Sequence, residues 1–413
     1  MVKYFYVKNF CSIKNRIDIS FETTKTSDET FYENYFKYKE LDILKVVSFY
    51  GMNASGKSSI IKALAALREL VVATPTLPYH PFEFDEISKI SPIELGIEFS
   101  YGNNENSSLY RYFVSYNKDF VLKEKFEKMT SQKPSLLFER SFSEGKSIIK
   151  LGTSIQNNVL LSAIKESVIS SKTFLSMFNQ FKVDDFYEAY NFFATKLINI
   201  SPEVTRFDDV IPSNQIINEG FKKFAVNLLK AADFNITDIY IDKSQTKYPL
   251  PPIPGVNPEK NALYFVHQGK NNNGGSIEFL NESLGTKKIV VLAERLYPVL
   301  SSPSVLIVDE LESSLHPELT KLIIKCFLDE TINPHNSQLI FTSHETSLLN
   351  LNLLRRDEIN FVYKDEHTCS TYVRSLKDFH VRKTENVEKS YLAGRYLTSP
   401  EVKEQLLEGT INA

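Results

Sequence analysis

The stretch ILKVVSFYGMNASGKSS, residues 43–59, joins a compact apolar run to a glycine-containing loop. The apolar part, residues 43–50, has the composition of a strand that is buried on both faces of a parallel sheet. The loop Gly51–Ser58 satisfies the pattern G-x4-G-K-[ST] without exception. Beyond it, apolar residues recur at helical spacing and form one face, made of Ile60, Leu64, Leu67 and Val71. The stretch therefore predicts strand, phosphate loop and helix in succession, with Pro75 and Pro78 ending the helix.

A loop of this pattern binds the phosphates of a nucleotide through its backbone. Its glycines let the chain turn so that consecutive N–H groups point at phosphate oxygens, and the next helix aims its N-terminus at the same anion. Lys57 is expected to reach the β- and γ-phosphates, and the Ser58 hydroxyl is expected to ligate Mg²⁺. The predicted ATP-binding residues of this stretch are Gly51, Asn53, Ala54, Ser55, Gly56, Lys57, Ser58 and Ser59.

Two acidic residues follow a second apolar run in the last third of the chain. Residues 305–308 (VLIV) predict a buried strand, which would deliver Asp309 and Glu310 to the phosphate side of the sheet. Asp309 is expected to hold Mg²⁺, directly or through water, and Glu310 to orient or deprotonate the attacking water. His344 follows a third predicted strand, residues 338–341, where it is placed to hydrogen-bond the γ-phosphate or the attacking water.

Changes in hydrophobic period divide the chain into three predicted segments. Residues 1–152 combine two N-terminal strands and the phosphate loop with an antiparallel meander, because apolar residues alternate from residue 92 onward. Residues 153–260 lose this alternation and predict a helical insertion that ends in a proline-rich loop, 243–258. Residues 261–413 begin with a hairpin and then alternate helix and strand, which predicts a parallel sheet. The expected fold class is α/β, with an additional antiparallel β lobe.

The composition excludes several classes of protein. The chain has 413 residues with 48 Lys+Arg and 51 Asp+Glu, and its net charge of -3 is unlike that of a globally basic nucleic-acid binder. The three cysteines lie far apart in the sequence, so neither a disulfide framework nor a zinc site is expected. The sequence has no apolar leader and no apolar run of about 18 residues, so we expect a reduced, cytoplasmic protein without a membrane segment.

The motifs together resemble the ATPase heads of the ABC superfamily, above all the branch that includes the SMC, RecF and OLD proteins. Asn9–Asn15 (NFCSIKN) is similar to the element that opens these heads, and residues 281–288 (NESLGTKK) resemble the ABC signature. Ser283 and Gly285 match the signature Ser and second Gly, whereas Leu284 stands in place of the first Gly. The resemblance implies an ABC-type head with a phosphate loop and a β lobe.

A narrower resemblance is to compact ABC-type ATPases of the AAA family that belong to bacterial phage-defence operons of the abortive-infection type. The chain shares with them the motifs ESLGTKK, DELESSLHP, FTSH, LRRDEINF and YLAGRY. Within the second motif, residues 312–317 also resemble the D-loop of ABC proteins. The resemblance covers most of the length and is weakest in 153–260 and in 22–42, a polar stretch that predicts an inserted loop or short helices.

The resemblance implies an ATP-dependent sensor and regulator that uses ATP and Mg²⁺. Ser283, Gly285 and the N-terminus of the following helix would bind the ATP of a second copy, so that two ATP molecules hold together a homodimer or higher homo-oligomer. Its trigger would be a nucleic acid or a phage protein. A separate effector, a nuclease, is expected because the roughly 70 residues after His344 are too few for a nuclease domain of the OLD type.

Other interpretations remain open at the level of sequence. The chain could be a DNA-repair or chromosome-handling ATPase of the RecF/SMC type, or an ATP-dependent scaffold with little turnover. Arg355 and Arg356 either pair with the acids beside them or contact a ligand, and Gly394-Arg395 is either a helix cap or a contact for a partner. The Phe-rich faces of the predicted helical region, 153–232, are expected to be covered by a partner.

Overall fold

The computed structural model describes most of the chain, namely residues 1–24, 32–72, 76–104, 106–130, 133–200, 218–232, 235–242, 262–268, 274–313, 315–382 and 384–396. The predicted proline-rich loop, 243–258, lies outside the described residues. Among the residues that are described, no helix has both the length and the apolar character that are needed to cross a bilayer.

The chain divides into two compact units. The first contains Met1–Ile200 and Pro303–Ala413, and the second contains Ser201–Ser302. This division differs from the three predicted segments, because the chain up to Ile200 belongs to the first unit and the predicted C-terminal lobe is shared between the two. The reason is that strand pairing, which sequence periodicity does not report, attaches residues 197–200, in the middle of the predicted segment 153–260, to the first unit.

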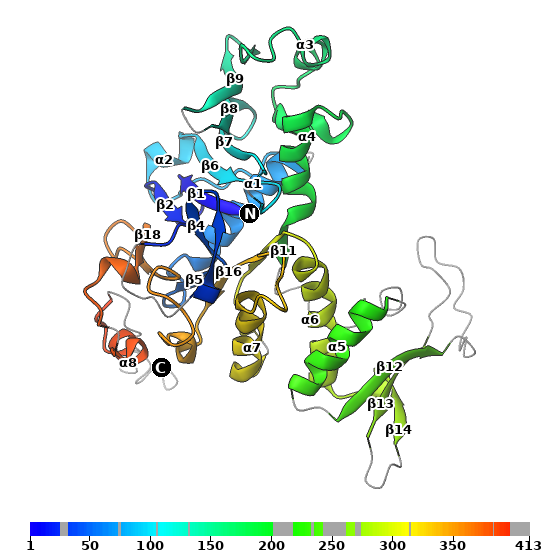
Figure 1. Cartoon of the computed structure of the whole chain (residues 1–413). Coiled ribbons are helices and arrows are strands. Elements are labelled where there is room, and N and C mark those ends of the chain that lie inside the picture. Colours follow the sequence, from blue (N-terminus) through cyan, green and yellow to red (C-terminus); the bar gives the residue numbers. More distant parts are fainter. Residues whose placement is uncertain are drawn as a thin grey trace, which may run out of the picture. The chain divides into compact units, whose positions relative to one another are not determined.

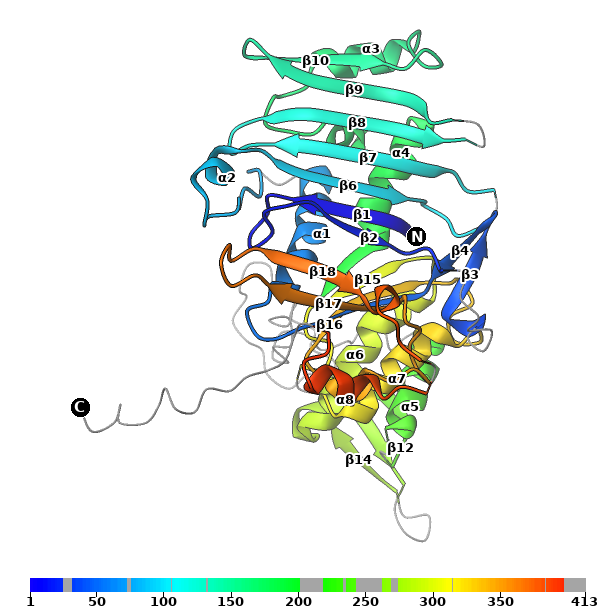
Figure 2. The same ribbon diagram turned by 90° about the vertical axis from the view of Figure 1, so that its left-hand side faces the viewer.

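A seven-stranded antiparallel sheet forms one layer of the first unit. Its order is β10-β9-β8-β7-β6-β1-β2, which Figure 2 shows as a ladder. The strand pairings confirm the predicted N-terminal pair and the predicted meander. In β2, for example, buried Ile17 and Ile19 alternate with exposed residues, as the sequence period indicated. Their bounds are β1 Val2–Lys8, β2 Ile17–Ser20, β6 Ile93–Phe99, β7 Leu109–Tyr116, β8 Val121–Met129, β9 Ser135–Ser143 and β10 Lys146–Leu151. The short helix α2, Glu86–Ile90, precedes β6.

The second layer of this unit is a six-stranded sheet in the order β11-β15-β16-β5-β17-β18. Neighbouring strands are parallel except for β18, which runs antiparallel to β17 at the edge. The bounds are β5 Val46–Tyr50, β11 Leu197–Ile200, β15 Val305–Val308, β16 Gln338–Ser343, β17 Ile359–Lys364 and β18 Thr371–Ser375. Helices α1 (Lys57–Val72) and α7 (Pro317–Leu328) follow β5 and β15 (Figure 1), which confirms the predicted alternation of strand and helix.

Lys45 interrupts the apolar run that was predicted to form one strand. The residues before it form β4, Leu41–Leu44, which pairs with β3, Tyr35–Tyr38, in an antiparallel hairpin. The prediction of a single strand over 43–50 is therefore wrong. The prediction of an inserted loop or short helices over 22–42 is wrong for the two strands, whereas the 3-10 helix Tyr32–Asn34 agrees with it. The Lys45 side chain is fully buried and its Nζ donates to the carbonyl oxygen of Leu328 at 3.1 Å, so the break in the run is anchored by a tertiary hydrogen bond.

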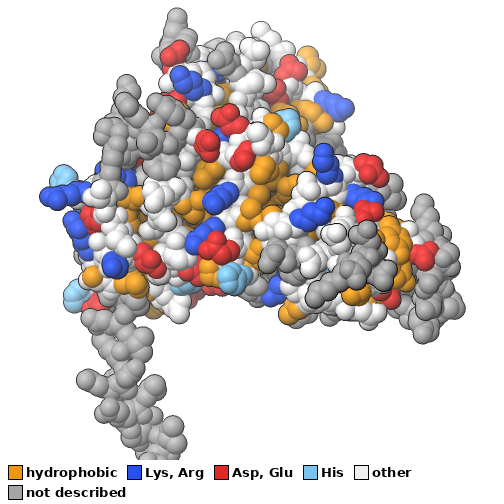
Figure 3. Space-filling view, turned by 60° about the horizontal axis from the view of Figure 1, so that its bottom comes forward, with side chains coloured by type: hydrophobic (Ala, Val, Ile, Leu, Met, Phe, Trp, Pro, Cys, Tyr) orange, Lys and Arg blue, Asp and Glu red, His pale blue; other side chains and the backbone are white. Residues whose placement is uncertain are grey.

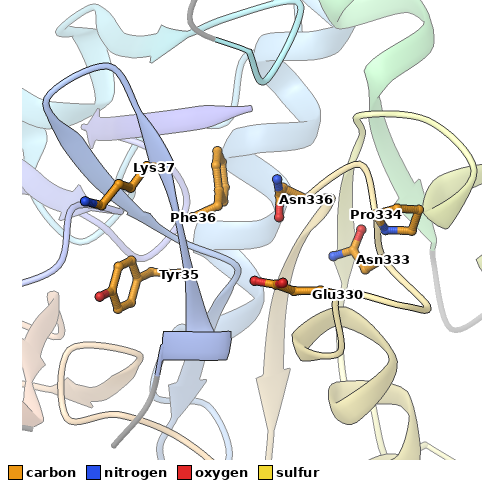
Figure 4. A pocket seen from close by; sticks show the side chains of 7 residues that line it. All are labelled: Tyr35, Phe36, Lys37, Glu330, Asn333, Pro334 and Asn336. Atoms are coloured by element: carbon orange, nitrogen blue, oxygen red, sulfur yellow. The ribbon is translucent and has the colours of Figure 1, made fainter. Parts of the chain in front are cut away.

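The β3–β4 hairpin also borders a hollow of about 490 Å³. Figure 4 shows that strand β3 and the loop after α7 face one another across it. The lining residues are Tyr35, Phe36, Lys37, Glu330, Asn333, Pro334 and Asn336.

The phenylalanines that follow the meander pack against the seven-stranded sheet of the same chain. The ring centroid of Phe138 lies 4.8 Å from Phe174 and 5.9 Å from Phe186, and that of Phe99 lies 4.4 Å from Phe192. All five rings are at most 1% exposed, so the expectation that a partner covers these faces is wrong here. The elements of this region are α3 Val159–Glu166, a 3-10 helix at Leu175–Asn179, α4 Asp184–Asn191, a π-helical turn at Phe192–Lys196, and β11.

A buried ion pair attaches this region to the sheet. Arg140 and Glu124 have fully buried side chains whose Nη1 and Oε2 lie 3.4 Å apart. The Glu124 carboxylate accepts hydrogen bonds from the backbone N–H groups of Phe174 and Leu175, and Arg140 donates to the carbonyl oxygen of Lys172. Because buried charges require such partners, this pair holds the turn before the 3-10 helix in one position.

In its described residues, the second unit combines the helices α5 and α6 with a three-stranded antiparallel sheet, β12-β13-β14. The β13–β14 pair confirms the predicted hairpin, whereas β12 was not predicted. Helix α6 begins at Leu284, three residues before the predicted start, because the Ser283 hydroxyl caps it by accepting from the N–H of Thr286 at 3.1 Å. The bounds are α5 Glu219–Ala231, β12 Ile236–Asp242, β13 Ala262–His267, β14 Gly275–Glu278 and α6 Leu284–Leu300.

The two motifs near the C-terminus have structural roles in the first unit. Arg355 is buried and forms a two-pronged ion pair with Asp357, with both N···O distances at 2.9 Å, so the pairing interpretation holds for this arginine. The YLAGRY motif lies at the end of α8, Val387–Leu392, where Gly394 has a φ of 76°. Tyr396 of the same motif stacks on Phe361 at 4.7 Å, which fastens this end of the chain to β17.

Candidate functional site

Three neighbouring parallel strands bring the predicted site residues to one edge of the six-stranded sheet. Strand β16 lies between β15 and β5, with Val308 paired to Phe341 and Ser343 paired to Tyr50. Because the strands are parallel, their carboxyl ends meet at the same edge, which is where ligands bind in open α/β sheets. Gly51, the pair Asp309-Glu310, and His344 follow directly from these three ends.

The loop between β5 and α1 requires glycine at two positions. A Cβ atom on Gly51 would lie 2.2 Å from the carbonyl oxygen of Val362, and one on Gly56 would lie 2.0 Å from Oγ1 of Thr371. Gly56 also has a φ of 103°, which side chains rarely tolerate. Ala54 adopts a φ of 61°, so the loop turns sharply before α1 begins at Lys57. The N-terminus of α1 consequently points into the loop, which favours an anion there.

Lys57 lies inside this loop with its ammonium group held by backbone oxygens. Its Nζ donates to the carbonyl oxygens of Gly51 at 2.9 Å and Met52 at 3.0 Å, and lies 3.4 Å from Nδ1 of His344. Burial lowers the pKa of Lys57 to about 8, against the opposing effect of the carboxylates that follow β15. The lysine is therefore a desolvated cation that gains from an approaching phosphate.

Thr342 links the two acids that follow β15, although the sequence did not single it out. Its hydroxyl donates to Oδ1 of Asp309 at 2.6 Å and accepts from the backbone N–H of Glu310 at 2.7 Å. Glu310 has a φ of 54°, a left-handed conformation that is uncommon for glutamate. Strain of this kind is found at functional sites when the surroundings maintain it, and here the bond from Thr342 does so. The only sequence signal for Thr342 was its place in the FTSH motif.

His344 lies between the lysine and the acids. Its Nε2 is 3.9 Å from Oε1 of Glu310, and its backbone N–H donates to the carboxylate of Glu312. Burial lowers the pKa of His344, and the nearby Lys57 cation lowers it further, while the carboxylates oppose this. The imidazole is thus biased toward its neutral form, which can both donate and accept a hydrogen bond.

The NFCSIKN element, residues 9–15, contacts the phosphate loop through the Ser12 hydroxyl. The Ser12 hydroxyl lies 2.7 Å from that of Ser59, and Thr371 of β18 donates to the carbonyl oxygen of Ser55 at 2.8 Å. The Thr371 hydroxyl is also 2.8 Å from that of Ser12, so the three hydroxyls form one hydrogen-bonded layer. Thr371 was not predicted, and no sequence pattern marks it, because it meets the loop only through the pairing of β18 with β17.

The predicted signature residues belong to the second unit. Ser283 and Gly285 are exposed at the N-terminal end of α6, and Leu284 between them has 59% of its surface exposed. Glu282 before them is buried and hydrogen-bonds to His267 of β13, which fixes the approach to the helix. The site of the first unit therefore brings together the phosphate loop, the acids and His344. The signature residues lie at the N-terminus of α6, in the second unit.

A comparison of the sequence with known families identifies the fold family. The profile of the family described as "AAA domain, putative AbiEii toxin, Type IV TA system" matches residues 46–350. The chain belongs to this AAA family. The match runs from the first residue of β5 to beyond His344, so it includes the phosphate loop and the acids after β15.

Solved structures similar to this AAA chain include heads of SMC proteins. The SMC head domain from Thermotoga maritima is 14% identical, covers 91% of this chain and 98% of its own, and has a TM-score of 0.43. The Smc head domain from Pyrococcus furiosus, with an extended coiled coil and bound to the C-terminal domain of ScpA, is 11% identical, with 91% and 96% covered and a TM-score of 0.43. No curated protein matches the chain.

The loop of this AAA domain offers hydroxyl groups that suit a nucleotide phosphate with Mg²⁺. The Ser58 hydroxyl is partly exposed and has no hydrogen-bond partner within the described part of the chain. The Ser55 hydroxyl is buried in the same loop and likewise has no hydrogen-bond partner among the described residues. Mg²⁺ takes few protein ligands and completes its shell with phosphate oxygens and water, so Ser58 and Asp309 are a fitting pair of oxygen donors.

Proposed function

We propose that this chain binds ATP with Mg²⁺ at the Gly51–Ser59 loop and hydrolyses it. One observation carries the proposal: a phosphate loop, a pair of acids and a histidine converge on one edge of a parallel sheet. There, Nζ of Lys57 lies 3.4 Å from Nδ1 of His344. Membership of the AAA family supports it. Convergence of these groups from three strands is what positioning of a triphosphate and an attacking water requires.

The roles follow from the placement of each side chain. Lys57 would exchange its two carbonyl partners for the β- and γ-phosphate oxygens, and Ser58 and Asp309 would hold Mg²⁺, which neutralises phosphate charge. Glu310, half-exposed at the sheet edge, would take the proton of the attacking water. The neutral imidazole of His344 would hydrogen-bond the γ-phosphate or that water.

ATP affinity is expected to weaken as the pH rises above about 8. The pKa of Lys57 is about 8 in the free protein, and a bound phosphate favours the charged lysine. Binding above this pKa therefore takes up a proton, and the affinity falls by up to about tenfold per pH unit. Calorimetry near pH 7 and near pH 9, in buffers of different ionisation enthalpy, measures this uptake. The His344→Gln variant should keep the dependence, and equal wild-type affinity at both pH values would contradict the role of Lys57.

The proposal extends to a dimer in which each copy completes the site of the other. Ser283, Gly285 and the N-terminal end of α6 would bind the γ-phosphate of ATP held by a second copy. Their exposure supports this, as does the exposure of Leu280 and Leu284, which are 63% and 59% exposed. ATP would then join the two copies until hydrolysis releases them.

In the cell, the chain would be a cytoplasmic sensor and regulator of an anti-phage defence system. The motifs shared with phage-defence ATPases support this, together with a family description that refers to toxin–antitoxin systems. The trigger would be a nucleic acid or a phage protein, and a separate nuclease would act as the effector.

The purified chain is expected to hydrolyse ATP with Mg²⁺ but to cleave neither DNA nor RNA with Mg²⁺ or Mn²⁺. Co-expression with the products of neighbouring genes, with and without phage challenge, should identify the effector as a bound chain whose deletion removes resistance. Metal-dependent cleavage by the purified chain, lost in a variant outside the ATPase motifs, would refute a separate effector. Resistance that survives deletion of every neighbouring gene would also refute it.

A further inference from the structure

A second hollow, of about 730 Å³, lies in the first unit away from the phosphate loop. It is formed by residues between β18 and α8, by Arg395 after the end of α8, and by Arg356 before β17. In Figure 3, Lys, Arg and His side chains gather at the left-hand edge, the side on which α8 lies in Figure 1. The lining residues are Arg356, Lys377, Phe379, His380, Val381, Arg382, Thr384, Glu385 and Arg395.

The hollow carries an excess of positive charge. Four of its side chains are permanent or near-permanent cations, Arg356, Lys377, Arg382 and Arg395, whereas only Glu385 is acidic. Lys377 and Arg382 form no ion pair with any carboxylate in the part of the chain that the structure describes. Because Lys377 and Arg382 lack such a counter-charge, an anion in the hollow would lower the electrostatic energy.

The one carboxylate of the hollow is already engaged. Glu385 accepts hydrogen bonds at its Oε1 from the hydroxyl of Tyr396 at 2.8 Å, the hydroxyl of Ser390 at 2.9 Å, and Nη1 of Arg395 at 2.7 Å. Burial would raise the pKa of Glu385, but these hydrogen bonds outweigh it and lower the pKa. The carboxylate thus stays ionised and positions Arg395, whose side chain is still 54% exposed and keeps N–H donors for a ligand.

The wall of the hollow is held in place by aromatic packing. The Phe379 ring lies 4.3 Å from the guanidinium carbon of Arg374 and 5.1 Å from the ring of Tyr396. Tyr396 in turn stacks on Phe361 of β17, so the wall is attached to the six-stranded sheet. A site whose walls are fixed before binding loses less entropy when a ligand enters.

We propose that this hollow binds a compact anion with two or more phosphate groups, either a nucleotide or the phosphorylated end of a nucleic acid. Its volume falls within the range of about 300–1,000 Å³ that is typical of small-ligand sites. Arginine forks match phosphate oxygens in pairs, and three of the four cations are arginines. None of the phosphate-loop residues lines the hollow, so the inference does not depend on ATP hydrolysis.

Calorimetric titration with inorganic pyrophosphate tests this site in four proteins. They are the wild type, the hollow variant Lys377→Ser/Arg382→Ser, the phosphate-loop variant Lys57→Ala, and the control Lys146→Ser/Lys150→Ser, which removes the same charge from exposed positions on β10. We expect one binding event to persist in Lys57→Ala and in the control. It should weaken by roughly tenfold or more in a fifth protein, the combined hollow variant Lys57→Ala/Lys377→Ser/Arg382→Ser, in which the phosphate loop is also disabled. Binding that is equally strong in Lys57→Ala and in the combined variant overturns the proposal, because the phosphate loop is disabled in both.

Further titrations in the Lys57→Ala protein identify the source of the phosphates. ADP and a short 5′-phosphorylated single-stranded oligonucleotide are compared, and whichever shows the larger loss in the combined hollow variant is the better ligand. Either result supports phosphate recognition. An oligoglutamate peptide of equal charge that displaces pyrophosphate equally well would overturn it, because that outcome indicates attraction of any anion. The hollow variant should hydrolyse ATP at the wild-type rate, so failure of the ATPase proposal is detected separately.

Discussion

Replacement of Lys57 by alanine is expected to remove ATP binding. The Lys57 ammonium group is the cation inside the loop, and it is buried beside Gly51, Met52 and His344. Loss of one partner from a desolvated charge pair costs about 2–5 kcal/mol, which is a roughly thirtyfold to several-thousandfold rise in Kd. Isothermal titration with ATP and Mg²⁺ measures the loss directly.

Lys62→Ala is the matched control for this variant. Lys62 lies on the same helix but is exposed to solvent, so its removal should leave the ATP affinity unchanged. A thermal unfolding curve of each variant separates lost binding from lost folding, since the Lys57 side chain also satisfies two backbone carbonyl groups. ATP affinity that is the same in Lys57→Ala and in the wild type would refute the assignment of the phosphate loop.

Replacement of Glu310 by glutamine should stop hydrolysis while ATP still binds. The amide has the same shape as the carboxylate but cannot take a proton from water, and loss of a positioned base costs about 10²–10⁴-fold in rate. The backbone N–H of Glu310 donates to the Thr342 hydroxyl, and the Glu310 side chain takes no part in this bond. The left-handed conformation at residue 310 should therefore persist in the variant. Single-turnover hydrolysis and equilibrium binding of ATP measure the two effects separately.

The same variant tests the proposed dimer. If ATP joins two copies, Glu310→Gln should accumulate as a dimer with ATP, because hydrolysis no longer releases it. Glu318→Gln, an exposed change on α7, serves as the control and should behave as the wild type. Light scattering that gives the same mass for Glu310→Gln with and without ATP would contradict an ATP-joined dimer.

Long elements with a regular hydrophobic period were predictable. The strands of the meander alternate over seven to nine residues in β6, β7 and β8, and helix α1 shows a continuous apolar face. Not every short strand was predictable: β2 and β15 have four residues each and were predicted, whereas β11 and β3, also of four residues, lie in segments where no strand was expected. Residues 197–200 form a strand because they pair with β15, although 108 positions separate Leu197 from its partner Val305.

The phenylalanines after the meander illustrate the same limit. Their spacing indicated apolar faces but not what would cover them, and an external partner was the expectation. In the structure Phe174 and Phe186 pack on Phe138 of the sheet, so the cover is part of the same chain. Burial depends on which distant surface is available, and a sequence pattern contains no information about that surface.

The sequence by itself determined which chemistry this protein can hold. The phosphate loop, the acids Asp309 and Glu310, and His344 each follow an apolar run, and parallel strands must bring their carboxyl ends to one edge. Tertiary structure alone decided how these groups are supported: Thr342 ties the two acids together, and Thr371 supports the loop. A local motif reflects the backbone conformation of adjacent residues. A hydrogen bond between residues that are 33 positions apart, as for Thr342 and Asp309, or 316 apart, as for Thr371 and Ser55, exists only after the sheet has set the register of its strands.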